Sequence, residues 1–246
     1  MTIPLRRVGL APGVNAWFTG RPGLVPEPPV GRAGNLSHRR PHLPARLAAD
    51  RREVLEEIGL DAGALVWMDQ VHGAAVAVVG SDAPPGWQVP AVDGLVTRVA
   101  GRGLVVQTAD CVPITLAAGD VVAAVHVGRM GLVAGIVAAT IEALRGLTNV
   151  RPVAVLGPSI GGCCYEVPAA MQSEVVAAIP ETRATTSWGT PSLDLRAGVR
   201  ALLERADVAV IDEVASCTRH EDDWFSHRRD PDAGRQLSII VRDASA

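Results

Sequence analysis

A cysteine and a histidine face each other across a predicted β-hairpin. Cys111 and His126 flank two apolar runs, and Gly119 and Asp120 stand between those runs. A Gly-Asp pair in this setting is typical of a two-residue hairpin turn. With that turn, His126 lies opposite Pro113, and Cys111 lies two residues further along on the same face. Such diagonal partners are ~7–8 Å apart, so a thiolate and an imidazole there can share a metal ion. A slip of one residue would put them on opposite faces.

A second histidine completes a candidate ligand set. His72 follows a predicted strand and precedes Gly73, where the backbone can approach a site closely. His72, Cys111 and His126 together offer two imidazoles and one soft thiolate, which suits zinc. Three protein ligands leave a fourth position for water or substrate, as in catalytic zinc sites. On the hairpin pair alone, a buried thiol and a core histidine would be the favoured interpretation, and His72 changes it.

The same residues allow two other interpretations. Cys111 as a nucleophile and His126 as its base would give a thiol hydrolase or amidase that needs no metal. A purely structural metal in a binding module would leave no open coordination position, and chelation would then unfold the protein.

Arginines gather near the end of the chain. Arg228, Arg229 and Asp230 stand together and Arg235 follows a turn, and guanidinium groups bind phosphate oxygens in pairs. A solvated loop with local ion pairs is the alternative. Asn35, in Asn-Leu-Ser, is a further candidate that alone indicates only a loop. The glycine-rich residues 157–166 could present backbone N–H groups to an anion, although they lack a phosphate-binding lysine.

Composition limits the classes of function. The chain has 246 residues, of which 48% are hydrophobic and 20% charged, so we expect a folded protein with a large core. A net charge of −3 and 3% aromatic residues argue against a nucleic-acid partner. All 23 basic residues are arginines, which excludes lysine-based chemistry. No apolar run is long enough for a membrane span and the N-terminus lacks a signal-peptide pattern, so we expect a cytoplasmic location.

Apolar patterns predict the elements that must position these residues. Helices are expected at 44–58, 132–144, 168–179 and 193–205, the last with Ser192 as its N-cap. Short strands are expected at 14–19, 64–68, 74–79, 94–97, 104–108, 114–117, 121–127, 153–156, 208–211 and 236–241. Because strands come in runs rather than alternating with helices, an α+β fold with mixed sheets is favoured. We expect one domain over residues 1–246.

Taken in order, the motifs resemble those of the YfiH-like, laccase-domain proteins, also called multicopper polyphenol oxidases. The matching pieces span almost the whole chain: Asn35-Leu-Ser, Gln70-Val-His-Gly, Asp93-Gly-Leu-Val-Thr, Thr108-Ala-Asp-Cys-Val-Pro, His126-Val-Gly, Gly157-Pro-Ser-Ile-Gly, Cys164-Tyr-Glu-Val, Leu193-Asp-Leu, Cys217-Thr, Phe225-Ser-His-Arg-Arg-Asp and Gly234-Arg-Gln. The resemblance implies mixed β-sheets packed between helical layers, and a metal held by His72, Cys111 and His126.

The resemblance also implies an activity. Similar proteins are zinc-dependent purine nucleoside enzymes, which phosphorolyse adenosine, guanosine, inosine or methylthioadenosine and deaminate adenosine. Zinc-activated water would attack adenine in the deamination. Purine nucleosides and phosphate would then be the partners. The residues expected to act in catalysis are Cys111, His126, Asp110 and Asp230, and those expected to bind substrate or phosphate are Asn35, Arg228, Arg229 and Arg235. The polyphenol oxidase name implies copper, but a laccase needs many more histidines than the six present.

Two departures from the family pattern bear on substrate binding. The family usually has Trp-Arg-Gly after the His-x-Gly motif, whereas this chain has Arg129-Met130-Gly131. Adjacent residues on a strand point in opposite directions. If this segment is a strand, Arg129 would not replace the family's arginine, and phosphorolysis would be affected. The chain also has Ser37-His-Arg-Arg where the family often has Gly-Asp. The added charge is expected to alter the substrate range.

Overall fold

The computed structural model describes residues 2–23, 27–28, 30–214 and 216–244, and two six-stranded sheets form the centre of this part of the chain. The first sheet has the strand order β1 (Leu5–Ala11), β2 (Val14–Thr19), β14 (Gln236–Arg242), β7 (Gly103–Thr108), β3 (Leu65–Met68), β5 (Gln88–Val89). The second has the order β13 (Ala209–Glu213), β10 (Val153–Leu156), β8 (Val112–Ala118), β9 (Val121–Val127), β6 (Gly94–Thr97), β4 (Val76–Val79). Both contain parallel and antiparallel pairs.

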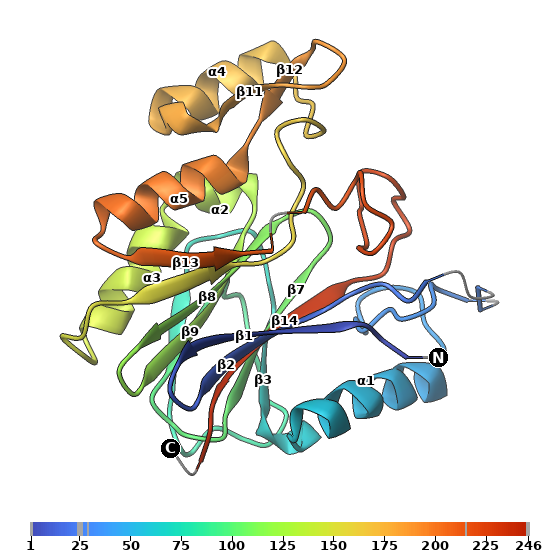
Figure 1. Ribbon diagram of the computed structural model, residues 1–246, viewed down its shortest axis with the longest axis vertical. Helices are drawn as coiled ribbons and strands as arrows, with labels where there is room; N and C mark the ends of the chain where they lie inside the picture. Colours follow the sequence, from blue (N-terminus) through green and yellow to red (C-terminus); the bar gives the residue numbers. More distant parts are fainter. Residues whose placement is uncertain (1, 24–26, 29, 215, 245–246) are drawn as a thin grey trace.

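The two sheets pack face to face, and helices cover their outer faces (Figure 1). Phe18 and Val106 of the first sheet meet Val122 and Ala124 of the second in a shared apolar core. Helix α1 (Pro44–Ile58) packs on the outer face of the first sheet. Helices α2 (Arg129–Ala134), α3 (Ile136–Arg145) and α5 (Leu195–Arg205) pack on the outer face of the second. The predicted arrangement of mixed sheets between helical layers is therefore confirmed.

Two helix predictions need correction. The helix expected at 132–144 is two helices, because Gly135 adopts a left-handed φ of 91° and ends α2 before α3 begins. The N-cap of α5 is Asp194, whose carboxylate accepts a hydrogen bond from the N–H of Ala197 at 2.9 Å. Ser192 instead lies in a strand, and its hydroxyl donates to the carbonyl of Gly162. The helix expected at 168–179 is α4 (Ala169–Ala178).

Every strand that the sequence predicts is present, and four of them (β2, β6, β9 and β10) have the predicted bounds. The sequence missed β1, β5 and the two-stranded sheet of β11 (Arg183–Thr185) and β12 (Pro191–Leu193). Strand β1 is a largely exposed edge strand with a register shift between Gly9 and Ala11, so it lacks a regular apolar alternation. Two single-turn 3₁₀ helices lie at Ala62–Ala64 and Pro180–Thr182.

The β8–β9 hairpin has the predicted register. Gly119 and Asp120 form its turn, and Pro113 pairs with His126. Both strands are buried along their whole length because the first sheet covers one face and helices cover the other. The hairpin therefore places Cys111 and His126 at one end of a rigid, fully packed element.

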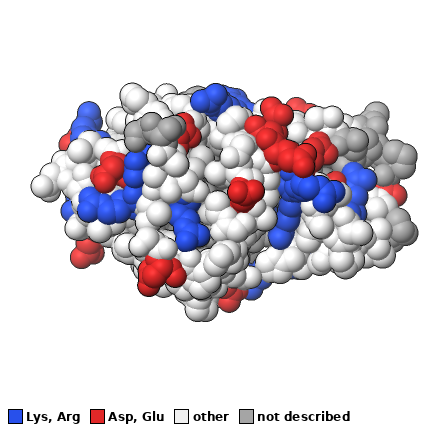
Figure 2. Space-filling view, turned by 90° about the horizontal axis from the view of Figure 1, so that it is seen from below, with Lys and Arg blue, Asp and Glu red and all other residues white. Residues whose placement is uncertain are grey.

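The surface that carries α1 is charged but mixed in sign. Arg46 and Asp50 form an ion pair at 2.7 Å along this helix. Figure 2, which views the molecule from below relative to Figure 1, shows acidic and basic side chains intermixed over this face.

Among the described residues, no helix is long and apolar enough to cross a bilayer.

Candidate functional site

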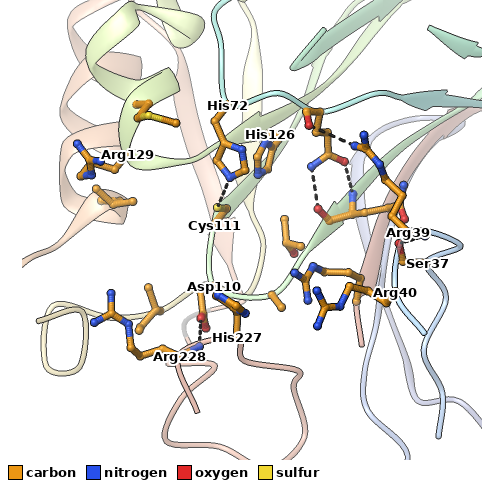
Figure 3. Close-up of a pocket in the computed structure, with 18 of the residues that line it drawn as sticks. Ser37, Arg39, Arg40, His72, Asp110, Cys111, His126, Arg129, His227 and Arg228 are labelled. Carbon is orange, nitrogen blue, oxygen red and sulfur yellow. Dashed lines mark hydrogen bonds between the residues drawn. The ribbon is translucent and has the colours of Figure 1, made fainter. Parts of the chain in front are cut away.

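Three side chains from distant parts of the chain meet at one end of the β8–β9 hairpin. The ligand atoms of His72, Cys111 and His126 all lie within 4.8 Å of one another. The Cys111 sulfur is 3.8 Å from Nε2 of His72. The two imidazole rings are edge to face, with centroids 4.8 Å apart. Figure 3 shows both rings directed toward the Cys111 sulfur.

Local backbone geometry positions these side chains. His126 lies on β9, and Cys111 directly precedes β8. His72 has a φ of 61° and Asp110 a φ of 96°, which are unusual values for residues other than glycine. Such strained conformations persist only where surrounding contacts hold them, and they cluster at functional sites.

Asp93 supplies the contacts that hold His72 and His126. Its carboxylate accepts backbone hydrogen bonds from Val71 at 3.2 Å, His72 at 3.0 Å and Gly73 at 2.7 Å. The same carboxylate accepts a bond of 2.7 Å from Nδ1 of His126. This bond leaves Nε2 of His126 free to bind a metal. The sequence indicates Asp93 only as part of a family motif and does not indicate its role.

The three charged groups shift one another's pKa values. Burial raises the pKa of the Cys111 thiol, but the imidazoles of His126 and His72 outweigh burial and lower it to about 6. Burial lowers the pKa of His126, whereas Cys111 and Asp93 raise it to about 9. Burial also opposes the charge of Asp93, yet hydrogen bonds from His126 and Gly73 hold its pKa below its usual range. Near neutral pH the site thus holds a thiolate and a carboxylate on either side of an imidazolium.

Two glycines make room for the cluster. A Cβ on Gly128 would lie 2.5 Å from Cδ2 of His72 and 3.3 Å from the Cys111 sulfur. A Cβ on Gly131 would lie 2.8 Å from the carbonyl oxygen of Gly73. The start of α2 therefore packs directly against the His72 loop, and a side chain at position 128 would displace the imidazole.

The cluster opens into a cavity of about 500 Å³ (Figure 3). This volume is within the usual range for small-molecule sites. Its apolar lining includes Met130, Ile160 and Leu195, with the ring of Tyr165 beside them. The described arginines that line it are Arg39, Arg40, Arg129, Arg228 and Arg235. Asp110 is the acidic residue in the lining.

Asp110 and Arg228 lie together in the cavity wall. The carboxylate of Asp110 accepts hydrogen bonds of 2.7 Å from the Thr218 hydroxyl and from the backbone N–H of Arg228. The Arg228 guanidinium stacks on Tyr165 at 5.1 Å and donates to the carbonyl of Glu166. Asp110 thus connects the ligand loop to the arginine-rich segment near the C-terminus.

The other residues predicted to act on substrate lie behind the wall or beside it. Asn35 is buried and bonds the backbone of Ser37 and Arg235, which both line the cavity. Arg229 donates to backbone carbonyls, among them those of Thr218 and Trp224. Asp230 forms an ion pair with Arg32 at 2.7 Å and does not line the cavity.

The structure corrects the expectation for the Arg129-Met130 departure. Both residues lie at the start of α2, not on a strand, and both line the cavity. Burial raises the pKa of Tyr165, and the nearby Arg129 and Arg228 act in the opposite direction. Arg129 is therefore placed to contact a ligand. Arg39 and Arg40, which the sequence indicates only as added charge after Ser37, line the same cavity.

The donor set fits a divalent metal. Zinc–sulfur and zinc–nitrogen bonds of about 2.3 and 2.0 Å in a tetrahedron place neighbouring ligand atoms roughly 3.3–3.8 Å apart, and the Cys111–His72 separation of 3.8 Å is close to this range. The low pKa of Cys111 supplies the thiolate that a metal requires. Without a metal, the thiolate and Asp93 favour a protonated, positively charged His126. A bound cation would supply that positive charge instead.

Comparison with known proteins places the chain in a family. The family model for multi-copper polyphenol oxidoreductase laccase matches residues 15–243. The chain belongs to this family. Among curated members, a purine nucleoside phosphorylase of Streptomyces coelicolor is 46% identical over 236 residues, covering 94% of this chain and 96% of that protein. One of Mycobacterium bovis is 43% identical over 226 residues, covering 90% and 89%.

Solved structures of the family have the same fold. The hypothetical protein YfiH of Bacillus licheniformis superposes with a TM-score of 0.82 at 29% identity, covering 93% of this chain and 92% of that one. A DUF152 protein of Neisseria meningitidis gives a TM-score of 0.83 at 28% identity, covering 99% and 100%. The resemblance seen in the sequence motifs is thereby confirmed.

Proposed function

We propose that this protein is a zinc-dependent purine nucleoside phosphorylase. The observation that supports the proposal is the position of His72, Cys111 and His126 on the wall of a cavity lined by arginines. Curated relatives that match about nine-tenths of the chain or more carry the name purine nucleoside phosphorylase. The cleavage of a nucleoside by phosphate is favoured by a polarising group and an anion site in one cavity. The cluster of His72, Cys111 and His126 would supply the first, and the arginines of the cavity the second.

The three donors would hold the metal with one coordination position open to the cavity. When bound, zinc supplies Lewis acidity at that position. Asp93 fixes the tautomer of His126 and the backbone of His72, as carboxylates behind metal-binding histidines commonly do. Copper, which the family description names, would face the same three donors. The groups of potential ligands among the described residues contain no cluster of histidines that resembles a trinuclear copper centre.

The arginines would hold phosphate and align it for attack. In phosphorolysis a phosphate oxygen bonds to the anomeric carbon of the ribose, while the bond from that carbon to the purine nitrogen breaks. The purine keeps the bonding electrons and must be protonated. Arg129 and Arg228 on one side of the cavity and Arg39 and Arg40 on the other (Figure 3), together with Arg235, would neutralise the phosphate. Of the two predicted acids only Asp110 lines the cavity, so Asp110 rather than Asp230 would pass a proton from the attacking dihydrogen phosphate to the purine.

The apolar part of the cavity suits the base. Met130, Ile160 and Leu195 offer an aliphatic surface, and Tyr165 an aromatic one. Such a surface binds the faces of a purine without selecting its exocyclic groups. Adenosine, guanosine, inosine and methylthioadenosine therefore all belong to the proposed substrate range.

A nucleoside panel tests the activity. Purified zinc-loaded protein should convert inosine and phosphate into hypoxanthine and ribose 1-phosphate, and should release no base when phosphate is omitted. Cys111→Ser and His126→Asn should each reduce the rate by about 100-fold or more, since they remove zinc ligands. Arg52→Ala on the exposed face of α1 is the matched control and should leave the rate unchanged. Absence of ribose 1-phosphate with every nucleoside would reject the proposal.

Adenosine deamination is a separate part of the proposal. The same metal-bound cavity would release ammonia from adenosine without phosphate. Conversion of adenosine to inosine in phosphate-free buffer measures it directly. If phosphorolysis occurs and this conversion does not, the deaminase assignment fails and the phosphorylase assignment stands.

A thiol hydrolase is the second candidate, and the charge state of the site favours it. Cys111 and His126 have pKa values of about 6 and 9, so they form a thiolate–imidazolium pair at neutral pH, with Asp93 orienting the imidazole. Iodoacetamide distinguishes the two functions. Protection of Cys111 by stoichiometric zinc supports metal ligation, whereas rapid alkylation of zinc-loaded protein with loss of activity supports the nucleophile. Chelation that unfolds the protein would instead indicate a structural metal.

A further inference from the structure

A second group of metal-binding side chains lies outside the cavity. The ligand atoms of Cys163, Cys164, Cys217 and His220 all lie within 4.8 Å of one another. The sulfurs of Cys163 and Cys164 are 3.6 Å apart, and Nδ1 of His220 is 3.8 Å from the Cys163 sulfur. All four cysteines of the chain are free thiols. None of these four residues lines the cavity at Cys111.

We propose that Cys163, Cys164, Cys217 and His220 form a second metal site, which binds one zinc ion in a closed structural position. Three thiolates and one imidazole are a common ligand set of structural zinc sites, and four protein ligands leave no position for substrate. A tetrahedron of zinc–sulfur bonds of about 2.3 Å has edges of roughly 3.8 Å. The Cys163–Cys164 separation of 3.6 Å and the Cys163–His220 separation of 3.8 Å are close to such edges, and the other ligand atoms lie within 4.8 Å of one another.

Two loops from different parts of the fold bring the ligands together. Cys163 and Cys164 lie in a turn after β10, and Cys217 and His220 lie in the connection after β13. Strands β10 and β13 are parallel neighbours, and an isolated bridge pairs Ser159 with Cys217 beyond their ends. The sheet therefore positions both loops, and the ligands meet where the loops have little other regular structure.

The surroundings suit a centre with a net negative charge. Three thiolates and one Zn²⁺ leave one negative charge, and the half-buried Arg196 is placed beside it. Its guanidinium donates to the hydroxyl of Ser159, which pairs with Cys217, and to the carbonyl of Ser216, the residue before Cys217. The backbone N–H of Gly161 points at the Cys217 sulfur at 3.3 Å. Such N–H···S bonds are typical of the shell around a metal-bound thiolate.

The second metal would position the cavity wall. Thr218 follows Cys217 directly, and its hydroxyl donates to Asp110, next to the ligand Cys111. Ile160 and Tyr165, on the other loop, line the cavity. Zinc at the second site would therefore connect both loops and fix Asp110, without contacting substrate.

Metal counting tests the proposal and does not depend on the nucleoside activity. Protein purified under reducing conditions should hold about two zinc ions per chain. Cys163→Ser with His220→Ala should hold one, and Cys111→Ser with His72→Ala should also hold one. Both replaced side chains of the first pair are at least partly exposed, which limits the damage to the core. The proposal would be overturned if the Cys163→Ser, His220→Ala protein retained two ions. It would also be overturned if the wild type held one ion and the Cys111→Ser, His72→Ala protein held none.

Cobalt spectroscopy covers the case in which the first pair fails to fold. Cobalt(II) added to the Cys111→Ser, His72→Ala protein, whose second cluster is intact, should give thiolate-to-cobalt charge-transfer absorption in the near ultraviolet and the intense visible bands of a tetrahedral site. Lack of these bands would reject the site. A disulfide among these cysteines, detected as two fewer titratable thiols than expected in the fresh protein, would also reject it.

Discussion

The carboxylate of Asp93 accepts a hydrogen bond of 2.7 Å from Nδ1 of His126. The same carboxylate also accepts the backbone N–H of His72. One side chain directly before β6 thus orients two candidate ligands that are far apart in the chain, and the pairing of β6 with β9 places it beside His126. Asp93 is a positioning residue for the metal centre.

Replacing Asp93 tests this role. Asp93→Asn keeps the size of the side chain but removes the charge that holds His126 and one acceptor for the loop of residues 71–73. We expect zinc affinity to fall by about 10-fold to 100-fold, the usual effect of losing a carboxylate behind a metal-binding histidine. Competition with a chromogenic chelator measures it. Asp50→Asn, also a buried carboxylate but on α1, is the control and should bind zinc like the wild type. Equal affinities in a folded Asp93→Asn protein would contradict the role.

The pKa of Cys111 predicts a pH profile for the metal-free protein. A thiol alkylates as its thiolate, so the rate rises as pH passes the thiol pKa. Because His126 and His72 lower that pKa to about 6, the alkylation of Cys111 should reach half its maximum near pH 6. In His126→Asn this midpoint should move upward, toward the ordinary thiol value of 9.0. Mass spectrometry of the Cys111 peptide follows the reaction. A wild-type midpoint near 9 would show that the imidazoles do not stabilise the thiolate.

The hairpin that joins Cys111 to His126 was predictable because a local signal determines it. Gly119 and Asp120 set the turn, and the turn sets the register of both strands. The break of the predicted helix 132–144 had a visible signal in Gly135, but the apolar residues on either side continue the helical pattern. There a left-handed backbone conformation overrides the pattern.

The positions of Asp93 and of the second cysteine cluster were not predictable from local patterns. Asp93 reaches His126 only because β6 pairs with β9, and Cys163 reaches His220 only because β10 pairs with β13. These pairings join segments far apart in sequence, and the ligands carry no short spacing motif. Arg129 was misjudged for a related reason, since its neighbours suggest a continuing strand whereas Gly128 ends the strand and begins α2.

Gly128 should be sensitive to the smallest possible side chain. In Gly128→Ala the added methyl group would lie 2.5 Å from the His72 ring, so the ring must leave its position beside Cys111 or the backbone must shift. We expect at least a 10-fold loss of zinc affinity with a secondary structure, seen by circular dichroism, like that of the wild type. Gly23→Ala, where a Cβ would meet nothing within 4 Å, is the matched control. Unchanged zinc binding in Gly128→Ala would mean that His72 is not held in the observed position.

We expect Arg129 to contact phosphate in place of the arginine that the family usually has at position 130. Removing a charge-assisted hydrogen bond costs about 1.5–3 kcal/mol, so Arg129→Ala should raise the KM for phosphate by about 10-fold to 100-fold while the KM for inosine changes little. Met130 is half exposed and lines the same cavity, so Met130→Arg added to Arg129→Ala should restore most of the phosphate affinity. Met130→Ala alone is the control and should leave the KM for phosphate unchanged. If Arg129→Ala has a wild-type KM for phosphate, the anion is held by the arginines on the opposite wall, and the departure from the family motif has no effect on phosphorolysis.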